Sequence, residues 1–142
     1  MQPLYTAMAT ADGGREGNVR TSDGNLAVSL TLPKGLGGPE TPGTTNPEQL
    51  FAAGYAACFH SALKLVAGGA NVDTSRSTVT AVVGIGPDDR GGFELAVELE
   101  VNLPGLDHDQ AVDLTNQAHA VCPYSNATRG NIPVDLTVSE DG

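Results

Sequence analysis

Aromatic residues are scarce in this sequence of 142 residues: they make up 4% of it, and tryptophan is absent. Grooves that bind single-stranded nucleic acid stack the bases on aromatic side chains, so this composition disfavours that class of protein. Basic residues are also few, with 7 Lys and Arg against 17 Asp and Glu, which leaves a formal net charge of −10. Nucleic acids and anionic membranes would repel such a surface, and we expect neither as a partner.

Long apolar runs and a leader segment are missing too. The longest nearly unbroken apolar run extends from Leu50 to Phe59, which is shorter than the ~20 residues that cross a bilayer. The start, Met1 to Tyr5, has no basic segment followed by an apolar one, so we expect no signal peptide. These features predict a cytoplasmic protein without a membrane segment, and the length predicts a single domain over residues 1–142.

Apolar and polar residues alternate in several segments, with the period of two that is typical of half-buried strands. The clearest case extends from Phe93 to Leu103 and pairs, across a turn rich in Asp and Gly, with a segment at 79–85. Further strands are predicted at 4–10, 26–32 and 133–138. The hairpin at 79–103 should have one face in water, as antiparallel sheets commonly do.

Two helices are predicted from their start signals. Asn46 is a good N-cap, Pro47 suits the first helical position, and Gln49 stands where a capping box needs it. This helix should continue to about Ala67, with apolar residues nearly all round it, which is typical of a buried helix. Asp107 begins the second helix, which should end near Val121. Because strands cluster instead of alternating with helices, the sequence predicts an α+β fold with antiparallel sheets.

The chain has only two cysteines, Cys58 inside the first helix and Cys122 at the end of the second. Their plainest interpretation is a pair of buried small hydrophobic residues. A reducing compartment disfavours a structural disulfide. The functional interpretation is a peroxide-reducing pair, in which one thiolate becomes a sulfenic acid and the second thiol condenses with it.

That chemistry needs a thiol with a lowered pKa. Cys58 lies eleven residues after Pro47, too far into the helix for the helix dipole to help, so a cation must come from elsewhere. Arg15, in a glycine-rich turn, is free to be aimed. The residues that share the helix face of Cys58 are mostly apolar, with a gap at Gly54, and suit an alkyl peroxide; they are Phe51, Gly54, Tyr55, Ser61, Ala62 and Leu65.

Two long motifs surround the cysteines. Residues 45–59, TNPEQLFAAGYAACF, resemble the first cysteine motif of the organic hydroperoxide resistance proteins, a branch of the OsmC family, and residues 119–131, HAVCPYSNATRGN, resemble the second. Residues 4–7, LYTA, and 13–17, GGREG, resemble the start of the same family. The resemblance covers nearly the whole chain, in order.

The resemblance implies a thiol-dependent peroxidase that reduces organic and fatty-acid hydroperoxides. Cys58 would be the peroxidatic cysteine and Cys122 the resolving one, with Arg15 as the activating arginine and Glu48 as the carboxylate that holds it. The family fold is an intertwined homodimer whose antiparallel sheets wrap around long central helices. The implied reductant is a dithiol such as a lipoylated protein, and no heme, flavin or metal cofactor is implied.

The spacing along the first helix bears on how this site is assembled. Glu48 and Cys58 are ten residues apart, which is about 15 Å along a straight helix. We therefore hypothesise that Arg15 and Glu48 serve the Cys58 of a partner chain.

Other functions fit parts of the pattern. Cys58, His60, His119 and Cys122 are suitable metal ligands, although Cys58 and His60 face different sides of a helix. A Cys-His hydrolase needs a histidine at the thiolate, and a glutaredoxin-like fold needs more chain after Cys122. The main alternative is a non-enzymatic dimeric module of the sister OsmC type that senses peroxide or binds lipid.

Overall fold

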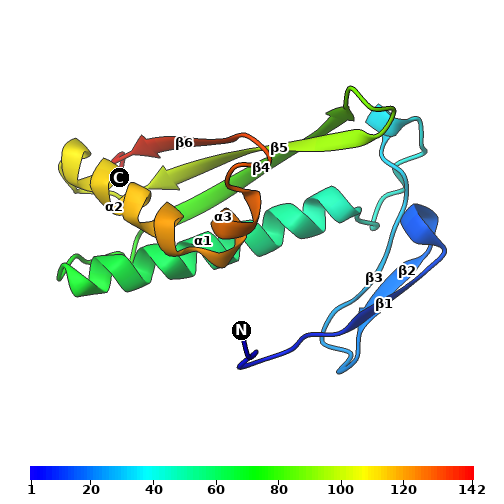
Figure 1. The fold of residues 1–142 in the computed structure, drawn as a ribbon, viewed down its shortest axis with the longest axis horizontal. Helices are drawn as coiled ribbons and strands as arrows, with labels where there is room; N and C mark the ends of the chain where they lie inside the picture. Colours follow the sequence, from blue (N-terminus) through cyan, green and yellow to red (C-terminus); the bar gives the residue numbers. More distant parts are fainter. The chain divides into compact units, whose positions relative to one another are not determined.

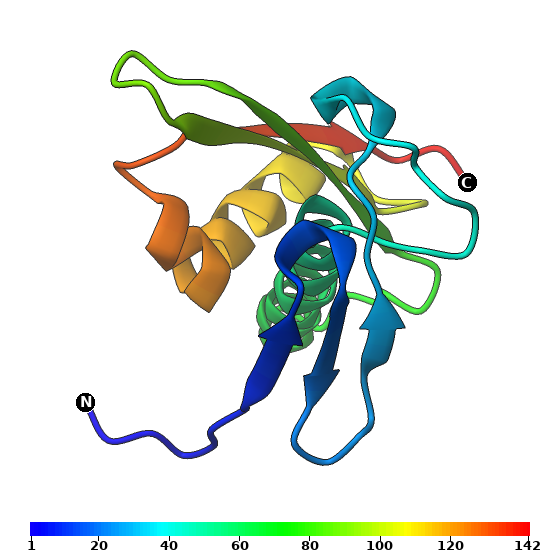
Figure 2. The same cartoon turned by 90° about the vertical axis from the view of Figure 1, so that its right-hand side faces the viewer.

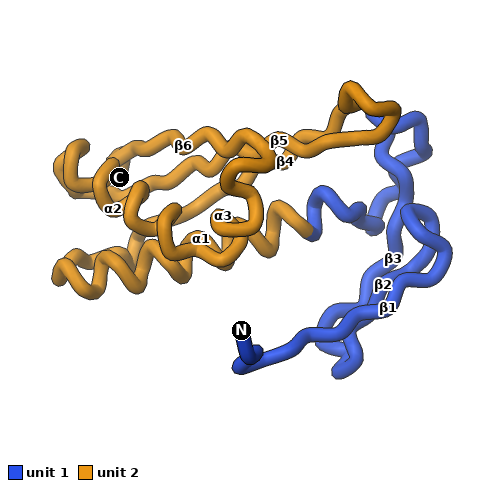
Figure 3. The backbone as a smooth tube through the Cα atoms, viewed as in Figure 1, with its two compact units in different colours: residues 1–50 blue, residues 51–142 orange.

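The computed structural model describes residues 1–142, which form two compact units, residues 1–50 and residues 51–142 (Figure 3). The first unit contains a three-stranded antiparallel sheet in the order β1-β2-β3. Its elements are β1 (Ala9–Asp12), η1 (Gly14–Glu16), β2 (Asn18–Thr21), β3 (Ala27–Ser29) and η2 (Lys34–Leu36).

The strands of the first unit differ from the prediction. The first strand begins at Ala9, not Leu4, and β3 covers only residues 27–29 of the segment predicted at 26–32. The sequence did not predict β2, because its four residues, Asn-Val-Arg-Thr, are too few to show a period. Leu30 is the one buried hydrophobic residue in this unit. A sheet with so little covered surface is not stable by itself in water.

Helix α1 (Pro47–Gly69) begins in the first unit and continues into the second. The predicted start is confirmed: the side-chain oxygen of Asn46 accepts a hydrogen bond of 2.8 Å from the backbone N–H of Gln49. The helix extends two residues beyond the predicted end.

By length and composition α1 is apolar enough to cross a membrane, so the expectation that no segment is long enough was wrong. The polar residues after Phe59 interrupt the apolar stretch without ending it. Core helices of water-soluble proteins can have the same length and composition. Only 28% of the apolar stretch is buried within the chain.

The sheet of the second unit consists of β4 (Thr78–Pro87), β5 (Phe93–Asn102) and β6 (Val134–Ser139). The predicted hairpin is confirmed, with β4 and β5 antiparallel from Thr78–Asn102 to Pro87–Phe93. However, β6 pairs with β5 in parallel, so the expectation of purely antiparallel sheets needs correction. The physical reason is the helical connection between β5 and β6, which returns the polypeptide to the end of the sheet at which β5 begins, so that β6 extends in the same direction as β5.

Helices α2 (His108–Val121) and α3 (Pro123–Thr128) form that connection. The N-cap of α2 is confirmed, since the Asp107 side chain accepts a hydrogen bond from the Gln110 N–H. In two views the helices of residues 51–142 lie on one face of the sheet (Figures 1 and 2). Val97, Leu99 and Val101 point from β5 into the core between them, while Glu98 and Glu100 alternate to the other face.

Candidate active site

The fold brings the two cysteines of the second unit together. The Sγ atoms of Cys58 and Cys122 lie 3.6 Å apart, although 64 residues separate them in the sequence. Both are free thiols; Cys122 is buried and Cys58 is half-buried. A disulfide has an S–S length of about 2.05 Å, so a displacement of about 1.6 Å brings the sulfurs to bonding distance. The geometry therefore permits a disulfide between these two thiols.

Cys122 owes its position to the corner between two helices. It ends α2, where its N–H donates to the Ala118 carbonyl, and it is the N-cap of α3, where Pro123 occupies the first helical position. Proline at that position is favourable because its missing N–H would have no helical partner. The corner turns the chain so that Cys122 faces α1 at Cys58.

The environment of Cys58 within residues 51–142 does not activate it. Burial raises the pKa of the Cys58 thiol, a backbone hydrogen bond from Tyr124 lowers it, and the contact with Cys122 raises it again. None of these causes is a cationic side chain. A positive charge beside the sulfur would favour the thiolate at neutral pH.

The first unit holds a suitable charge. Arg15, in η1, donates from both terminal nitrogens to the Glu48 carboxylate, at 2.6 Å and 2.8 Å. The hydrogen bond from Arg15 lowers the pKa of Glu48, and the same bond raises the pKa of Arg15. The pair therefore stays ionised at neutral pH. Such a two-point contact fixes the plane of the guanidinium and leaves its remaining N–H for another acceptor.

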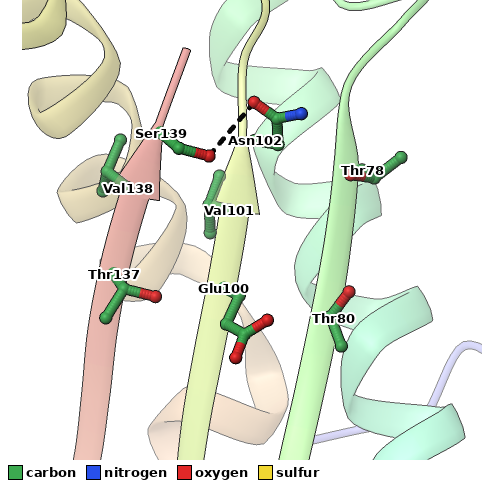
Figure 4. Close-up of a pocket in the computed structure, with 8 residues that line it drawn as sticks. All are labelled: Thr78, Thr80, Glu100, Val101, Asn102, Thr137, Val138 and Ser139. Carbon is green, nitrogen blue, oxygen red and sulfur yellow. Dashed lines mark hydrogen bonds between the residues drawn. The ribbon is translucent and has the colours of Figure 1, made fainter. Parts of the chain in front are cut away.

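An apolar groove of about 420 Å³ opens beside Cys58. Its lining is hydrophobic except for one serine and the thiol itself, and consists of Cys58, Ser61, Ala62, Leu65, Val121 and Pro123. Leu65 and Val121 are exposed at its edge. A hollow of about 230 Å³ on β4, β5 and β6 contains neither cysteine and is lined mainly by polar side chains such as Glu100 and Asn102 (Figure 4). The chemistry therefore favours the groove at Cys58.

The predicted lining of the Cys58 face divides into two parts. Ser61, Ala62 and Leu65 line the groove as expected. Phe51, Gly54 and Tyr55 instead belong to an aromatic cluster with Tyr124, whose ring is 6.1 Å from that of Phe51 and 5.7 Å from that of Tyr55.

The gap predicted at Gly54 is filled. A Cβ atom placed there would lie 3.2 Å from the Tyr124 hydroxyl oxygen, so Gly54 is the residue that lets this ring approach α1. The sequence did not identify Tyr124, Val121 and Pro123 as site residues. Their proximity to Cys122 was the available signal, but only the corner between α2 and α3 turns them toward Cys58.

The ring nitrogens of His60 and His119 contact hydroxyl groups and not the sulfurs. His60 Nε2 lies 2.9 Å from Ser77 Oγ, and His119 Nδ1 lies 2.8 Å from Ser125 Oγ. Burial lowers the pKa of both imidazoles. No three His, Cys, Asp or Glu side chains gather as a metal-ligand set. Neither a metal centre nor a Cys-His dyad is assembled by these residues.

A model of the OsmC-like protein family matches residues 38–137, which include both cysteines. An organic hydroperoxide resistance protein of Xanthomonas axonopodis pv. citri is 52% identical over 137 residues, covering 96% of this chain and 95% of the relative. The chain belongs to the OsmC-like family. Within this family, its similarity is to the organic hydroperoxide resistance proteins, as the two cysteine motifs predicted.

Solved structures place this OsmC-like protein in the same group. A crystal structure of an organic hydroperoxide resistance protein from Elizabethkingia anophelis has a TM-score of 0.94 and 56% identity, covering 99% of this chain and 100% of the other. The corresponding protein of Vibrio cholerae, with captopril bound in one of its active sites, has a TM-score of 0.88 and 50% identity, covering 100% of this chain and 95% of that one. The α+β fold of this OsmC-like protein is thus that of the family.

Proposed function

We propose that this protein is a thiol-dependent peroxidase that reduces organic hydroperoxides, including those of fatty acids, to alcohols. The observation that carries the proposal is the 3.6 Å separation of the Cys58 and Cys122 sulfurs at the edge of an apolar groove. Relatives named for organic hydroperoxide resistance support the substrate class. We propose that residues 1–142 act as one domain in the cytoplasm.

The proposed reaction has three steps. The Cys58 thiolate attacks the outer oxygen of the hydroperoxide; the O–O bond breaks, the alkoxide takes a proton and leaves as the alcohol, and Cys58 becomes a sulfenic acid. The Cys122 thiol then attacks that sulfur, which forms the disulfide and releases water. A dithiol, such as the dihydrolipoyl group of a lipoylated protein, reduces the disulfide by thiol–disulfide exchange and becomes a cyclic disulfide itself. No further cofactor or metal takes part.

The difference in exposure between the two cysteines determines which of them reacts first with the hydroperoxide. Cys58 is half-buried and borders the groove, whereas Cys122 is fully buried. A hydroperoxide therefore reaches Cys58 first. We propose that the groove binds the organic tail, since each buried methylene contributes about 0.8 kcal/mol. Phe51, Gly54 and Tyr55, which the sequence predicted as substrate-binding residues, pack against Tyr124 and do not line this groove.

We propose that Arg15 and Glu48 activate Cys58 as a pair. Glu48 is ten residues before Cys58 on α1, about 15 Å along the axis, so we assign the pair to the Cys58 of a partner chain. A homodimer also covers apolar surface that a single chain leaves exposed. The apolar stretch of α1 is only 28% buried within one chain, and the sheet of residues 9–29 has no buried residue.

Steady-state turnover tests the proposed function. With dihydrolipoamide as reductant, the protein should convert cumene hydroperoxide and a fatty-acid hydroperoxide to their alcohols in multiple turnovers. Its kcat/KM for these substrates should exceed that for hydrogen peroxide, which has no tail to bury. Alcohol and oxidised lipoamide should appear in equal amounts. Absence of turnover with every hydroperoxide, in protein whose thiols are reduced, would contradict the proposal.

Replacement of Arg15 tests the activating pair. Arg15→Ala should lower kcat/KM by about a hundredfold at neutral pH, the usual cost of removing one preorganised charge-stabilising donor. Because burial raises the pKa of Cys58, a variant without the cation should regain rate as the pH rises and more thiolate forms. The pH–rate profile of Arg15→Ala should therefore be displaced to higher pH than that of the wild type. An unchanged profile would exclude Arg15 from activation.

Mixed dimers test whether the site is shared between chains. Cys58→Ser retains Arg15, and Arg15→Ala retains Cys58, so a heterodimer of the two has one intact shared site. After unfolding and refolding together, the mixture should recover activity that neither variant has alone. A mixture of Cys58→Ser with the double variant is the matched control and should stay inactive. If the first mixture also stays inactive while forming heterodimers, the site lies within one chain.

A further inference from the structure

A chain of buried hydroxyl groups joins α1 to the two helices that flank Cys122. Tyr55 Oη is 2.8 Å from Ser125 Oγ and 3.2 Å from Thr128 Oγ1, and Ser125 Oγ is 2.8 Å from His119 Nδ1. Thr128 Oγ1 donates to the backbone carbonyl of Ser125 at 3.1 Å. Tyr55 and Ser125 have no exposed surface, and Thr128 is 4% exposed. Four contacts thus link α1, α2 and α3.

The number of available protons indicates which group donates and which accepts at each contact of this hydroxyl chain. The Thr128 hydroxyl proton is used on the Ser125 carbonyl, so its oxygen must accept the proton of Tyr55. The Tyr55 oxygen then accepts from Ser125, and the Ser125 oxygen accepts from His119. In the opposite direction Thr128 donates to Tyr55, Tyr55 to Ser125 and Ser125 to His119, and the Ser125 carbonyl keeps only the Arg129 N–H as its donor. Only His119 with its proton on Nδ1 satisfies every contact.

The hydroxyl chain connects residues that lie close to both cysteines in the sequence. Tyr55 lies three residues before Cys58, which is one helical turn, on the same face of α1. His119 and Ser125 lie three residues before and after Cys122, so their hydrogen bond spans the corner that contains it. Arg129 reinforces this corner by donating to the backbone carbonyl of His119 at 2.5 Å.

We propose that His119, Ser125 and Tyr55 are positioning residues for the resolving step, and that their directed hydrogen bonds hold Cys122 within reach of Cys58. This inference rests on the proposed peroxidase function. Once Cys58 is a sulfenic acid, two reactions compete. Attack by Cys122 releases water and forms the disulfide, whereas a second hydroperoxide transfers another oxygen, releases a second alcohol and leaves a sulfinic acid. Loss of positioning slows only the attack by Cys122.

Tyr55→Phe tests the proposal, because it removes the hydroxyl and keeps the ring that packs on Phe51 and Tyr124. Each variant, Tyr55→Phe and Ser125→Ala, is reduced and then treated with graded cumene hydroperoxide. Mass spectrometry gives the ratio of sulfinic acid to disulfide. The expected increase in that ratio is about fivefold, equivalent to about 1 kcal/mol at 1.36 kcal/mol per factor of ten. The first oxidation of Cys58 should keep its wild-type rate.

Three further variants separate positioning from general stability. Thr115→Val removes another fully buried hydroxyl, which donates to the Ala111 carbonyl at 2.8 Å and has no contact with the chain. Its ratio should remain that of the wild type even where its thermal stability falls as much as that of Ser125→Ala. His119→Asn retains an N–H near the position of Nδ1 and should preserve the ratio, whereas His119→Ala should raise it.

The outcomes are distinct from those that test the peroxidase itself. If wild-type protein turns over and forms the disulfide but Tyr55→Phe, Ser125→Ala and His119→Ala leave the ratio unchanged, the positioning proposal is wrong and the proposed function stands. An increase in Thr115→Val equal to that in Ser125→Ala would also overturn it. Nitrogen-15 NMR of the reduced protein provides a direct check: the Nδ1–H tautomer of His119 is expected, and the Nε2–H tautomer would contradict the direction of the chain.

Discussion

Cys58→Ser should abolish catalytic turnover of organic hydroperoxides and leave only the uncatalysed background rate. A serine hydroxyl remains protonated at neutral pH and has no base beside it, since His60 and His119 are directed to Ser77 and Ser125. Cys122 cannot replace the lost thiol because it is fully buried and does not meet solvent. The measurement is the rate of alcohol formation with excess dithiol, at saturating hydroperoxide.

The control for this variant is its thermal unfolding temperature, which should stay close to that of the wild type because serine is nearly the same size as cysteine and Cys58 is only half-buried. Turnover that survives in folded Cys58→Ser protein would contradict the mechanism. It would place the reactive group elsewhere and leave the cysteine pair with a structural role.

Cys122→Ser should permit one reaction per chain and no more. Cys58 still meets the hydroperoxide, so the first equivalent of alcohol should form at the wild-type rate. The sulfenic acid then has no thiol at 3.6 Å with which to condense, and further hydroperoxide should convert it to the sulfinic acid, which ordinary dithiols do not reduce. Rapid-mixing kinetics should show a burst of one alcohol per chain, followed by inactivation.

Mass spectrometry distinguishes this outcome from a general loss of structure. The peptide that contains Cys58 should gain two oxygen atoms in Cys122→Ser and none in the wild type treated identically. Sustained turnover by Cys122→Ser at low hydroperoxide would show that the external dithiol reduces the sulfenic acid directly. Cys122 would then be unnecessary for catalysis.

The sequence predicted those elements that local signals determine. The start of α1 follows from Asn46, Pro47 and Gln49, and β5 follows from the alternation of Val97, Leu99 and Val101 with acidic residues. These signals are properties of neighbouring residues, and the structure confirms them. The family resemblance supplied the overall fold class, which the solved structures confirm.

Other features depend on contacts between distant residues, which local patterns do not contain. The parallel pairing of β6 follows from the path of α2 and α3, and α3 itself has only six residues, too few to show a helical period. Gly54 was interpreted as a gap because the Tyr124 ring that fills it comes from the far end of the chain. The hydroxyl chain was invisible for the same reason, since 70 residues separate Tyr55 from Ser125.

The cation expected beside Cys58 could likewise be predicted only in part from the sequence. The sequence indicated that the thiol needs a cation, and the resemblance pointed to Arg15 and Glu48. The structure pairs those two side chains through two hydrogen bonds, while burial raises the pKa of Cys58 in the unit that contains it. The proposal that a second chain completes the reactive thiol rests on the ten-residue spacing of Glu48 and Cys58 along α1, whereas the contact between chains is not a local pattern.

Titration of the fully reduced protein with one equivalent of cumene hydroperoxide per chain tests the central claim most directly. The account predicts one cumyl alcohol per chain and a Cys58–Cys122 disulfide within that same chain. Mixing isotopically labelled and unlabelled protein before oxidation lets mass spectrometry distinguish a disulfide within a chain from one between chains. Thiols that survive the treatment, or disulfides that join labelled to unlabelled chains, would contradict it.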